Sequence, residues 1–405
     1  MKTNRREFLT SSIGAGMLAM ASTPPLSAAP SDTSLLKLDT IVKSPVKIAS
    51  VELLISGGHY FVRSTSTDGA VGIAETNERI RYLYPILQQL VMPYFKGKDA
   101  RAIESLVDGV YVHSSNYKLA GLALWCCVGW VEFSLFDLLG QVARKSVGEL
   151  LGGVIRTEIP VYLSSMRRDT TPEQEVEWVG KRMEETGARA CKLKIGGRMS
   201  KNADASPGRT DRLIPLARKT FGDAVAIHVD ANGSYDSAKA IEIGKMLEAH
   251  NVFFFEEPCP FEELEETKRV ADALTMPVAG GEQDTSLPRF QWMVKNRVAD
   301  IVQPDLDYNG GFVRTMRVAR LAAAAEMAIT PHGPQGGLST AYLVHFASAT
   351  PNMGKFQEYN AAPQKREAWF EPSLEVKNGV IKVPTGPGLG ITIDSTLLRQ
   401  SEPVK

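Results

Sequence analysis

From Ile159 onward, short apolar segments rich in β-branched residues alternate with longer segments whose apolar positions repeat at helical spacing. Buried parallel strands have the first pattern, and the helices that cover them have the second. Regular alternation of the two predicts βα units joined into one parallel sheet. We expect strands at 159–164, 190–196, 225–231, 252–256, 277–281, 299–303, 327–331 and 355–358, with helices between them such as 172–186, 235–249 and 310–326.

Eight strands of this kind predict an α/β fold, a (β/α) barrel of the TIM type with an altered last helix. Residues 48–74 alternate like an antiparallel β-meander, and residues 79–155 are helical. Strands followed by helices predict an N-terminal α+β capping domain over residues 30–155, ahead of a catalytic barrel over 156–360. The proline-containing residues 361–405 are expected to return to the capping domain.

The first 29 residues predict a targeting segment. Arg5 and Arg6 belong to a twin-arginine pattern, a weakly apolar run follows from Ile13 to Ala21, and small residues at 27–29 form a cleavage site. We therefore expect a twin-arginine signal peptide over residues 1–29 and a periplasmic mature protein that begins near Pro30. The alternative is a disordered basic tail.

Composition narrows the classes of partner. The 405 residues are 43% hydrophobic, and 46 Lys plus Arg balance 46 Asp plus Glu, which leaves no electrostatic footprint for nucleic acid or an anionic membrane. No stretch approaches about 18 uninterrupted apolar residues, so no membrane span is expected. The four cysteines include no CxxC pair, which gives neither zinc spacing nor a disulfide framework.

Three acids recur at the same point of three successive βα units. Asp230, Glu256 and Glu282 are separated by equal steps of 26 residues, each at the end of an expected strand. Such side chains converge if the parallel strands close into a barrel. Isolated carboxylates do not gather in an apolar interior without compensation. The spacing therefore predicts a site for a hard divalent cation with oxygen ligands, most plausibly Mg²⁺.

Two lysines lie one unit earlier. Lys192 and Lys194 are two residues apart on one strand and share a face, while Leu193 between them faces the helices. Like-charge repulsion and desolvation are expected to lower the pKa of each lysine, which makes one of them a usable base. The alternative interpretation is a solvated strand edge.

Other polar residues follow the same strands. Asn232 shares the face of Asp230 and is a candidate substrate contact, whereas His228 lies one layer deeper, where a satisfied core histidine is favoured over a catalytic one. Glu257, next to Glu256, is expected to pair nearby, with one of the lysines as a candidate.

The last three strands contribute an acid and a base. Asp305 and His332 end adjacent strands, so an Asp–His pair can form above the barrel, fix the imidazole tautomer and raise its basicity. His332 is therefore a general-base candidate. Glu358 at the rim of the eighth strand, if burial keeps it protonated, can donate to an enolate oxygen.

In this order the motifs resemble the mandelate racemase branch of the enolase superfamily (the mandelate racemase/muconate lactonizing enzyme family), over the whole mature chain. The resemblance implies Mg²⁺ bound by Asp230, Glu256 and Glu282. It implies Lys194 as a base on one face of the substrate and the His332–Asp305 pair on the other. It also implies that Lys192 and Glu358 hold the enolate, and family habit favours a homo-oligomer. The muconate-lactonizing branch has a lysine at the position of Asp305, which argues against that branch.

The shared reaction of this family is removal of the proton next to a carboxylate of a small-molecule substrate. We expect dehydration of an acid sugar to a 2-keto-3-deoxy acid, because the family contains many such enzymes and the expected lining is polar. A racemase or epimerase is the close alternative, since both bases are present, and a periplasmic sugar-acid binding protein is the distant one. The candidate lining, beside the turn at 332–335, comprises Asn77, Arg79, Arg81, Arg167 and Arg168.

Each of these loop arginines has a solvated charge as its alternative. The polar insertion at 198–208 is interpreted as a solvated loop, with a mobile lid as the other possibility.

Overall fold

The structure is a computed structural model that describes residues 34–334, 336–363 and 369–404. The signal peptide expected over residues 1–29 and Gln335 of the turn after His332 lie outside the described residues.

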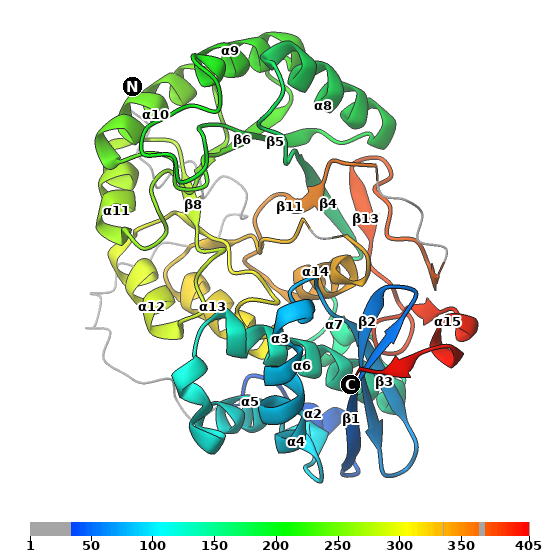
Figure 1. Ribbon diagram of the computed structural model, residues 1–405. Helices are drawn as coiled ribbons and strands as arrows, with labels where there is room; N and C mark the ends of the chain where they lie inside the picture. Colours follow the sequence, from blue (N-terminus) through cyan, green and yellow to red (C-terminus); the bar gives the residue numbers. More distant parts are fainter. Residues whose placement is uncertain (1–33, 335, 364–368, 405) are drawn as a thin grey trace, which may run out of the picture.

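Eight parallel strands form the wall of a barrel, and their hydrogen-bonded order follows the chain (Figure 1). The ring closes where β11 pairs with β4, and where Ile329 of β10 bonds the segment before β11: its amide donates to the Asn352 carbonyl (3.0 Å), and its carbonyl accepts from the Gly354 amide (2.9 Å). The expected TIM-type barrel is therefore confirmed. Its strands are β4 (Glu158–Ser164), β5 (Ala190–Lys194), β6 (Ala226–Asp230), β7 (Phe254–Glu256), β8 (Val278–Gly280), β9 (Ile301–Val302), β10 (Ala328–Ile329) and β11 (Gln357–Asn360).

The later strands differ from the expected bounds. β9 and β10 have only two residues each, because Pro304 and Pro331 follow within two residues and lack the N–H that a strand ladder needs. β11 ends two residues later than expected, so that Glu358 lies within the strand, in register with Tyr162 of β4.

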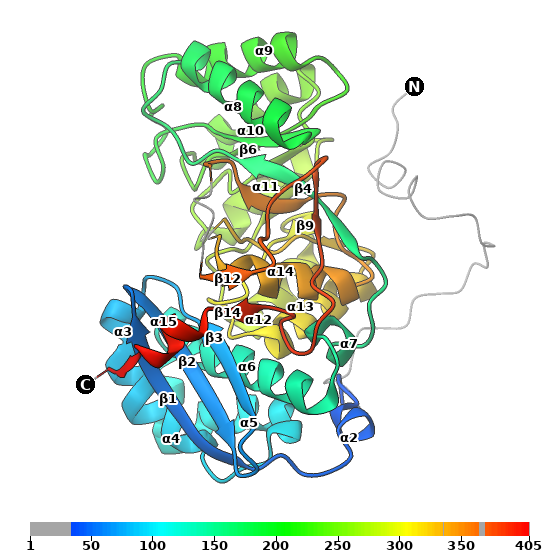
Figure 2. The same cartoon turned by 90° about the vertical axis from the view of Figure 1, so that its right-hand side faces the viewer.

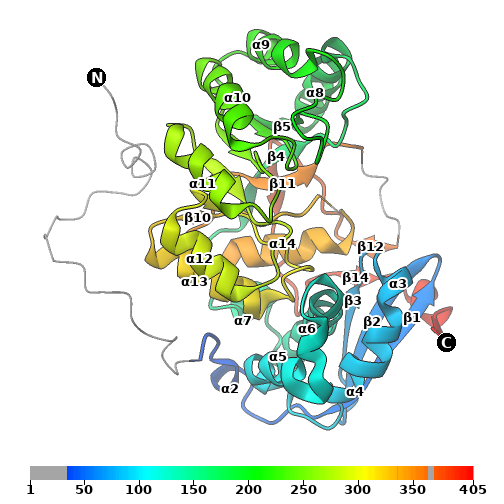
Figure 3. The same cartoon turned by 60° about the vertical axis from the view of Figure 1, so that its left-hand side comes forward.

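Seven helices connect the strands and surround them (Figure 3). The first shows how the sequence sets the ends: Thr171 and Gln174 form a capping box, Pro172 takes the first helical position, and Gly187 ends the helix with φ of 71°. The helix expected at 172–186 is thereby confirmed. The helices are α8 (Pro172–Thr186), α9 (Arg209–Phe221), α10 (Ser237–Ala249), α11 (Leu264–Ala273), α12 (Leu287–Asn296), α13 (Phe312–Ala324) and α14 (Leu338–Ala349).

The segment before the barrel forms an α+β cap, as expected. Its antiparallel meander packs against the long helix α6, and Figure 2 shows the sheet at the end of the molecule away from α9. The strands are β1 (Ile48–Ser56), β2 (His59–Ser66) and β3 (Val71–Glu75). The helices are α2 (Leu38–Ile41), α3 (Ile80–Ile86), the π-helical turn η1 (Leu87–Val91), α4 (Met92–Phe95), the 3-10 turn η2 (Ala100–Ala102), α5 (Ile103–Val112), the 3-10 segment η3 (His113–Leu119), α6 (Leu122–Ala143) and α7 (Val147–Leu150).

The C-terminal segment contacts both parts. β13 runs antiparallel to β4 at the barrel wall, whereas β15 adds to the cap sheet beside β1, where Leu54 is in register with Pro403. The elements of this segment are β12 (Phe370–Glu371), β13 (Val380–Lys382), β14 (Thr392–Ile393), α15 (Ser395–Arg399) and β15 (Glu402–Pro403).

Helix α6 joins the cap to the barrel. Among the described residues it is the one helix long and apolar enough to cross a membrane, yet 89% of its apolar window is buried inside the protein, as in a core helix. Phe133 stacks on Tyr342 of α14 (ring centroids 4.1 Å apart), and Glu132 accepts a hydrogen bond from the Val313 amide at the start of α13 (2.8 Å). The cap and the barrel therefore share a packed interface.

We predict that Leu193→Ala lowers the free energy of unfolding by about 2–5 kcal/mol. Leu193 is fully buried in the layer between strands and helices, and its removal leaves a cavity there. Urea denaturation measures the loss, and Leu193→Met, which keeps the volume, should cost less than about 1.5 kcal/mol. Equal stability of Leu193→Ala and wild type would place this side chain outside the core.

Candidate active site

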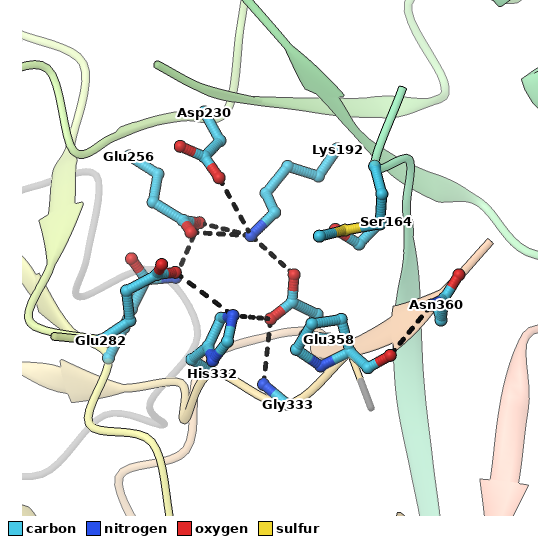
Figure 4. A network of polar contacts seen from close by, with 12 residues as sticks. Ser164, Lys192, Asp230, Glu256, Glu282, His332, Gly333, Glu358 and Asn360 are labelled. Carbon is cyan, nitrogen blue, oxygen red and sulfur yellow. Dashed lines mark hydrogen bonds and ion pairs between the residues drawn. The ribbon is translucent and has the colours of Figure 1, made fainter. Parts of the chain in front are cut away.

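The three expected acids meet at the carboxyl ends of neighbouring strands. Asp230 ends β6 and is in register with Glu256, which ends β7. Glu282 follows β8 after Gly281, whose φ of 115° is in the region that glycine favours. One carboxylate oxygen from each lies within 4.8 Å of the others, and all three side chains are buried (Figure 4).

Two buried ammonium groups compensate this cluster. Lys192 Nζ lies 2.7 and 2.9 Å from the two carboxylate oxygens of Glu256 and 2.7 Å from Oε1 of Glu358. Lys194 Nζ bonds Asp230 and lies 3.3 Å from Asn232 Oδ1. The lysines therefore face acids, and the solvated strand edge is excluded.

The expected lowering of both lysine pKa values is wrong for Lys192. Burial alone lowers the pKa of Lys192, but the charges of Glu256 and Glu358 outweigh it and raise the pKa well above its ordinary value. The expectation considered only the repulsion between the two lysines, but each ammonium group also contacts carboxylates.

Negative charge is still in excess. Burial, together with the charges of Asp230, Glu358 and Glu282, outweighs Lys192 and raises the pKa of Glu256 to about 8. Burial also raises that of Asp230, but Lys194 and Lys192 hold its pKa below the ordinary value. The cluster thus retains a proton near neutral pH, which a divalent cation would displace.

The Asp–His pair forms as expected. The Nδ1 of His332 lies 2.7 Å from Oδ2 of Asp305, and Oδ1 of Asp305 accepts the Tyr308 amide at 2.9 Å. The Nε2 of His332 faces Glu282 Oε2 at 3.4 Å and Glu358 Oε2 at 3.9 Å. Burial lowers the pKa of His332, but Glu282, Glu358 and Asp305 outweigh it and raise the pKa to about 10.

Glu358 is not the protonated donor that we expected. Burial raises its pKa, but the cations of Lys192, His332 and Lys194 lower it far below the ordinary value. Besides Lys192, its carboxylate accepts the Gly333 amide at 3.0 Å. Glu358 is therefore ionised and holds Lys192 and the His332 turn in place (Figure 4).

Asn232 bridges two walls of the site. Its Oδ1 accepts from Lys194 and from Arg168 Nη2 (2.7 Å), and its Nδ2 donates to Glu257 Oε2 (3.2 Å). The expected pairing of Glu257 with a lysine is wrong, because the strand turns directly after Glu256 and sends Glu257 toward Asn232. The backbone φ of Glu257, 41°, marks that turn.

Arg167, a candidate substrate contact, lies against α8, whereas its neighbour Arg168 reaches Asn232. The Arg167 guanidinium lies over Trp178 of α8 (4.7 Å) and 3.6 Å from Glu175. Arg168 bonds Asn232 and thereby lies beside Lys194. The sequence alone does not separate two adjacent arginines of one loop.

His228 is a core histidine, as favoured, but it is not satisfied. It is buried, and its ring packs against Tyr162 and Phe254 (centroids 4.6 and 4.1 Å away), while neither ring nitrogen has a hydrogen-bond partner. Burial and the Lys192 charge lower its pKa well below the ordinary value, so the ring is neutral.

The remaining lining residues divide. Arg79 reaches over Tyr308, next to the Asp–His pair, whereas Arg81 is exposed.

The first residues of the 198–208 insertion bond the neighbouring loop, with Met199 and Asn202 amides donating to the Asn232 and Ser234 carbonyls (3.0 and 2.8 Å). This supports a fixed, solvated loop.

Sequence reasoning missed three residues of the site. Gln303 Nε2 donates to Glu256 Oε2 (2.9 Å), and Tyr308 lies between the Asp–His pair and the cap. Buried Arg209 donates to the Lys194 carbonyl (2.9 Å). The place of Gln303 at a strand end was a usable signal, but neither Tyr308 nor Arg209 carried one.

A barrel with clustered acids, two buried lysines and an Asp–His pair at one end defines an enzyme active site. The chain belongs to the family described as Enolase C-terminal domain-like, whose model matches residues 174–397.

Individual relatives agree. Arabinonate dehydratase of Saccharolobus solfataricus is 28% identical over 88% of this chain and 91% of its own. D-galactarolactone cycloisomerase of Agrobacterium fabrum is 30% identical, over 84% and 90%. The crystal structure of the mandelate racemase/muconate lactonizing protein from Paracoccus denitrificans, complexed with magnesium, is 26% identical over 89% and 99%, with a TM-score of 0.82. The protein is therefore an enzyme of lyase or racemase type, and the sugar-acid binding protein is excluded.

We predict that binding of Mg²⁺ releases protons and lowers the pKa of His332 from its metal-free value of about 10. A cation at the cluster neutralises the carboxylates that raise it, so the imidazolium loses its stabilisation. Titration of the His332 ring by NMR with and without Mg²⁺ measures the shift, and His345, buried against Leu389, is the internal control. An unchanged His332 pKa would contradict binding of the metal beside Glu282.

Proposed function

We propose that the protein is a Mg²⁺-dependent acid-sugar dehydratase, which removes the proton next to a carboxylate and yields a 2-keto-3-deoxy acid. One observation carries this proposal: Lys194 and His332 stand at opposite ends of the acid cluster, Lys194 against Asp230 and His332 against Glu282. A substrate held at the cluster would meet one base from each side. The dehydratase names of several relatives support the substrate class.

The acid cluster fits Mg²⁺. Asp230, Glu256 and Glu282 offer converging hard oxygens, and Glu282 Oε2 is buried without a hydrogen-bond partner. Bound Mg²⁺ would supply positive charge against which a substrate carboxylate takes up electrons. Lys192 lies where it can add a second cation to that carboxylate, because it reaches Asp230, Glu256 and Glu358 from the barrel interior.

The first step is removal of the α-proton. Lys194 takes it as the base, and the C–H electron pair moves into the carboxylate to form an enolate. Asn232 Oδ1 accepts a hydrogen bond from the Lys194 nitrogen and helps to hold it in place. Glu358, being ionised, keeps Lys192 directed at the developing charge rather than donating a proton itself.

The second step breaks the bond between the β-carbon and its hydroxyl. The enolate electrons form the carbon–carbon double bond, and protonated His332 gives its proton to the departing oxygen, which leaves as water. Asp305 holds the ring of His332 in place for this acid role through its bond to Nδ1. The enol product then tautomerises to the keto acid.

Racemisation or epimerisation is the second candidate, and the same two-sided placement of Lys194 and His332 favours it. In that reaction His332 returns a proton to the α-carbon from the opposite face instead of to a leaving hydroxyl. The two reactions differ in product, not in the first step.

Incubation of the Mg²⁺-loaded enzyme with aldonic and aldaric acids in D₂O separates the candidates. We predict a keto acid detectable with semicarbazide, and a loss of about 10²–10⁴-fold in kcat for Lys194→Met and for His332→Asn. Exposed Lys201→Met in the 198–208 insertion is the matched control. Deuterium at the α-carbon without keto acid would favour racemisation, and no exchange with any acid would contradict both.

Export to the periplasm and homo-oligomeric assembly also remain proposals. The twin-arginine pattern supports the first, and cell fractionation of wild type against Arg5→Lys/Arg6→Lys tests it, since retention of both in the cytoplasm would contradict export. Light scattering tests the second, and a monomeric mass would contradict it.

A further inference from the structure

The guanidinium of Arg79 has no carboxylate partner among the described residues, although it lies in a partly buried position. Its Nη2 donates to the Tyr308 hydroxyl (2.6 Å) and its Nη1 to the Tyr82 hydroxyl (2.9 Å), and both partners are neutral. Two other cap arginines are paired with acids: Arg63 with Glu52 (3.0 Å) and Arg101 with Asp99 (2.7 Å). The positive charge of Arg79 is therefore uncompensated in a way that theirs is not.

Three acids that are near Arg79 or Tyr308 in the sequence make their hydrogen bonds to other groups. Asp305 bonds His332 and the Tyr308 amide, and Glu75 bonds His59 (2.8 Å) and the Leu338 amide (3.2 Å). Asp307 accepts the indole N–H of Trp130 (2.8 Å), and burial together with Asp305 raises its pKa to about 8. The charge of Arg79 acts on Asp307 in the opposite direction, although no hydrogen bond or ion pair joins the two side chains among the described residues.

Arg79 is one aromatic ring away from the proposed acid–base residue. Its guanidinium carbon lies 4.7 Å over the centre of the Tyr308 ring, whose centre is 6.3 Å from that of His332. Arg79 belongs to the cap and is the residue immediately before α3. It therefore stands on the His332 side of the site, with the Tyr308 ring between Arg79 and His332.

Arg168, the other arginine near the site, is less suited to a second anion. Its Nη2 already donates to Asn232 Oδ1 (2.7 Å), and it lies beside the ammonium of Lys194. Arg168 is thus on the Lys194 side of the site, whereas Arg79, on the His332 side, is held by two phenols that leave further N–H donors unused.

We propose that Arg79 binds a second carboxylate at the far end of the substrate, so that the preferred substrates are acid sugars with a carboxylate at both ends rather than at one. This inference rests on the proposed function, because it needs the first carboxylate at the acid cluster. A guanidinium presents paired N–H donors that match a carboxylate, and a charge-assisted pair in a partly buried site is stronger than a neutral one. A terminal hydroxymethyl group gives neither the charge nor the paired acceptors.

The test compares each aldaric acid with the aldonic acid of the same configuration, which differ only in the terminal group. We expect wild type to favour the diacid in kcat/KM. Arg79→Gln should lower kcat/KM on the diacid by about 10- to 100-fold, chiefly through KM, and change the monoacid less than about threefold. Arg79→Lys, which keeps the charge but not the paired donors, should fall between the two.

Two controls separate recognition from structure. Arg81→Gln removes an exposed arginine of the same cap segment and should leave both substrates unaffected. The thermal midpoint of Arg79→Gln shows whether the cap is still folded, and a destabilised variant is assayed below its midpoint beside Arg79→Lys.

Each outcome decides the inference. An equal loss on diacid and monoacid, or no loss on either, overturns it while leaving the proposed function in place. Wild-type preference for the monoacid overturns it as well. If wild type turns over neither acid and exchanges no α-proton, the proposed function fails and this inference fails with it.

Discussion

The burial of several carboxylates in one small volume is the constraint on which the site depends. Asp230, Glu256, Glu282 and Glu358 lie within reach of one another in the barrel mouth, where water does not screen them. Without positive charge this arrangement would cost more than a domain can offset. Lys192 and Lys194 supply part of that charge. The raised pKa values of Glu256 and His332 show that the two lysines do not balance all the buried carboxylates. The two lysines therefore make the buried carboxylates tolerable in the folded protein, but the site as a whole still lacks positive charge.

The barrel holds these residues where they are needed. Parallel pairing puts Lys194, Asp230 and Glu256 in adjacent register, so that strand geometry alone brings them to one level. The last pair is different: Asp305 and His332 lie beyond short strands that proline ends, and a bridge between the two residues and their side-chain bond keep them together. The cap reaches the barrel through helix α6, which packs on α14, and through the bond from Arg79 to Tyr308 beside the Asp–His pair.

The sequence predicted the barrel and the positions of the reactive side chains, because both follow from the regular spacing of residues along the chain. Equal spacing of Asp230, Glu256 and Glu282, and alternation along 192–194, are properties of strands that the fold preserves. The cap helices and the strand limits near Pro304 and Pro331 were less accurate, since proline acts on single hydrogen bonds that a periodic pattern averages out.

The charge states and loop contacts could not be predicted. The pKa of Lys192 depends on Glu256 and Glu358, which are distant in sequence. The sequence therefore predicted a lowered pKa, whereas these two carboxylates raise it. The choice between Arg167 and Arg168 depends on which one faces Trp178 and which one faces Asn232, and no pattern in that loop encodes it. Tyr308 and Arg209 act through partners on other elements, which is why neither carried a signal in the chain.

The location of a divalent cation tests the central claim most directly. Anomalous diffraction from crystals soaked with Mn²⁺, a close substitute for Mg²⁺, should give a peak about 2.1 Å from one oxygen of each of Asp230, Glu256 and Glu282. The Lys192 ammonium should then have moved away from Glu256. A cluster without a peak, with Lys192 still between Glu256 and Glu358, would contradict the account.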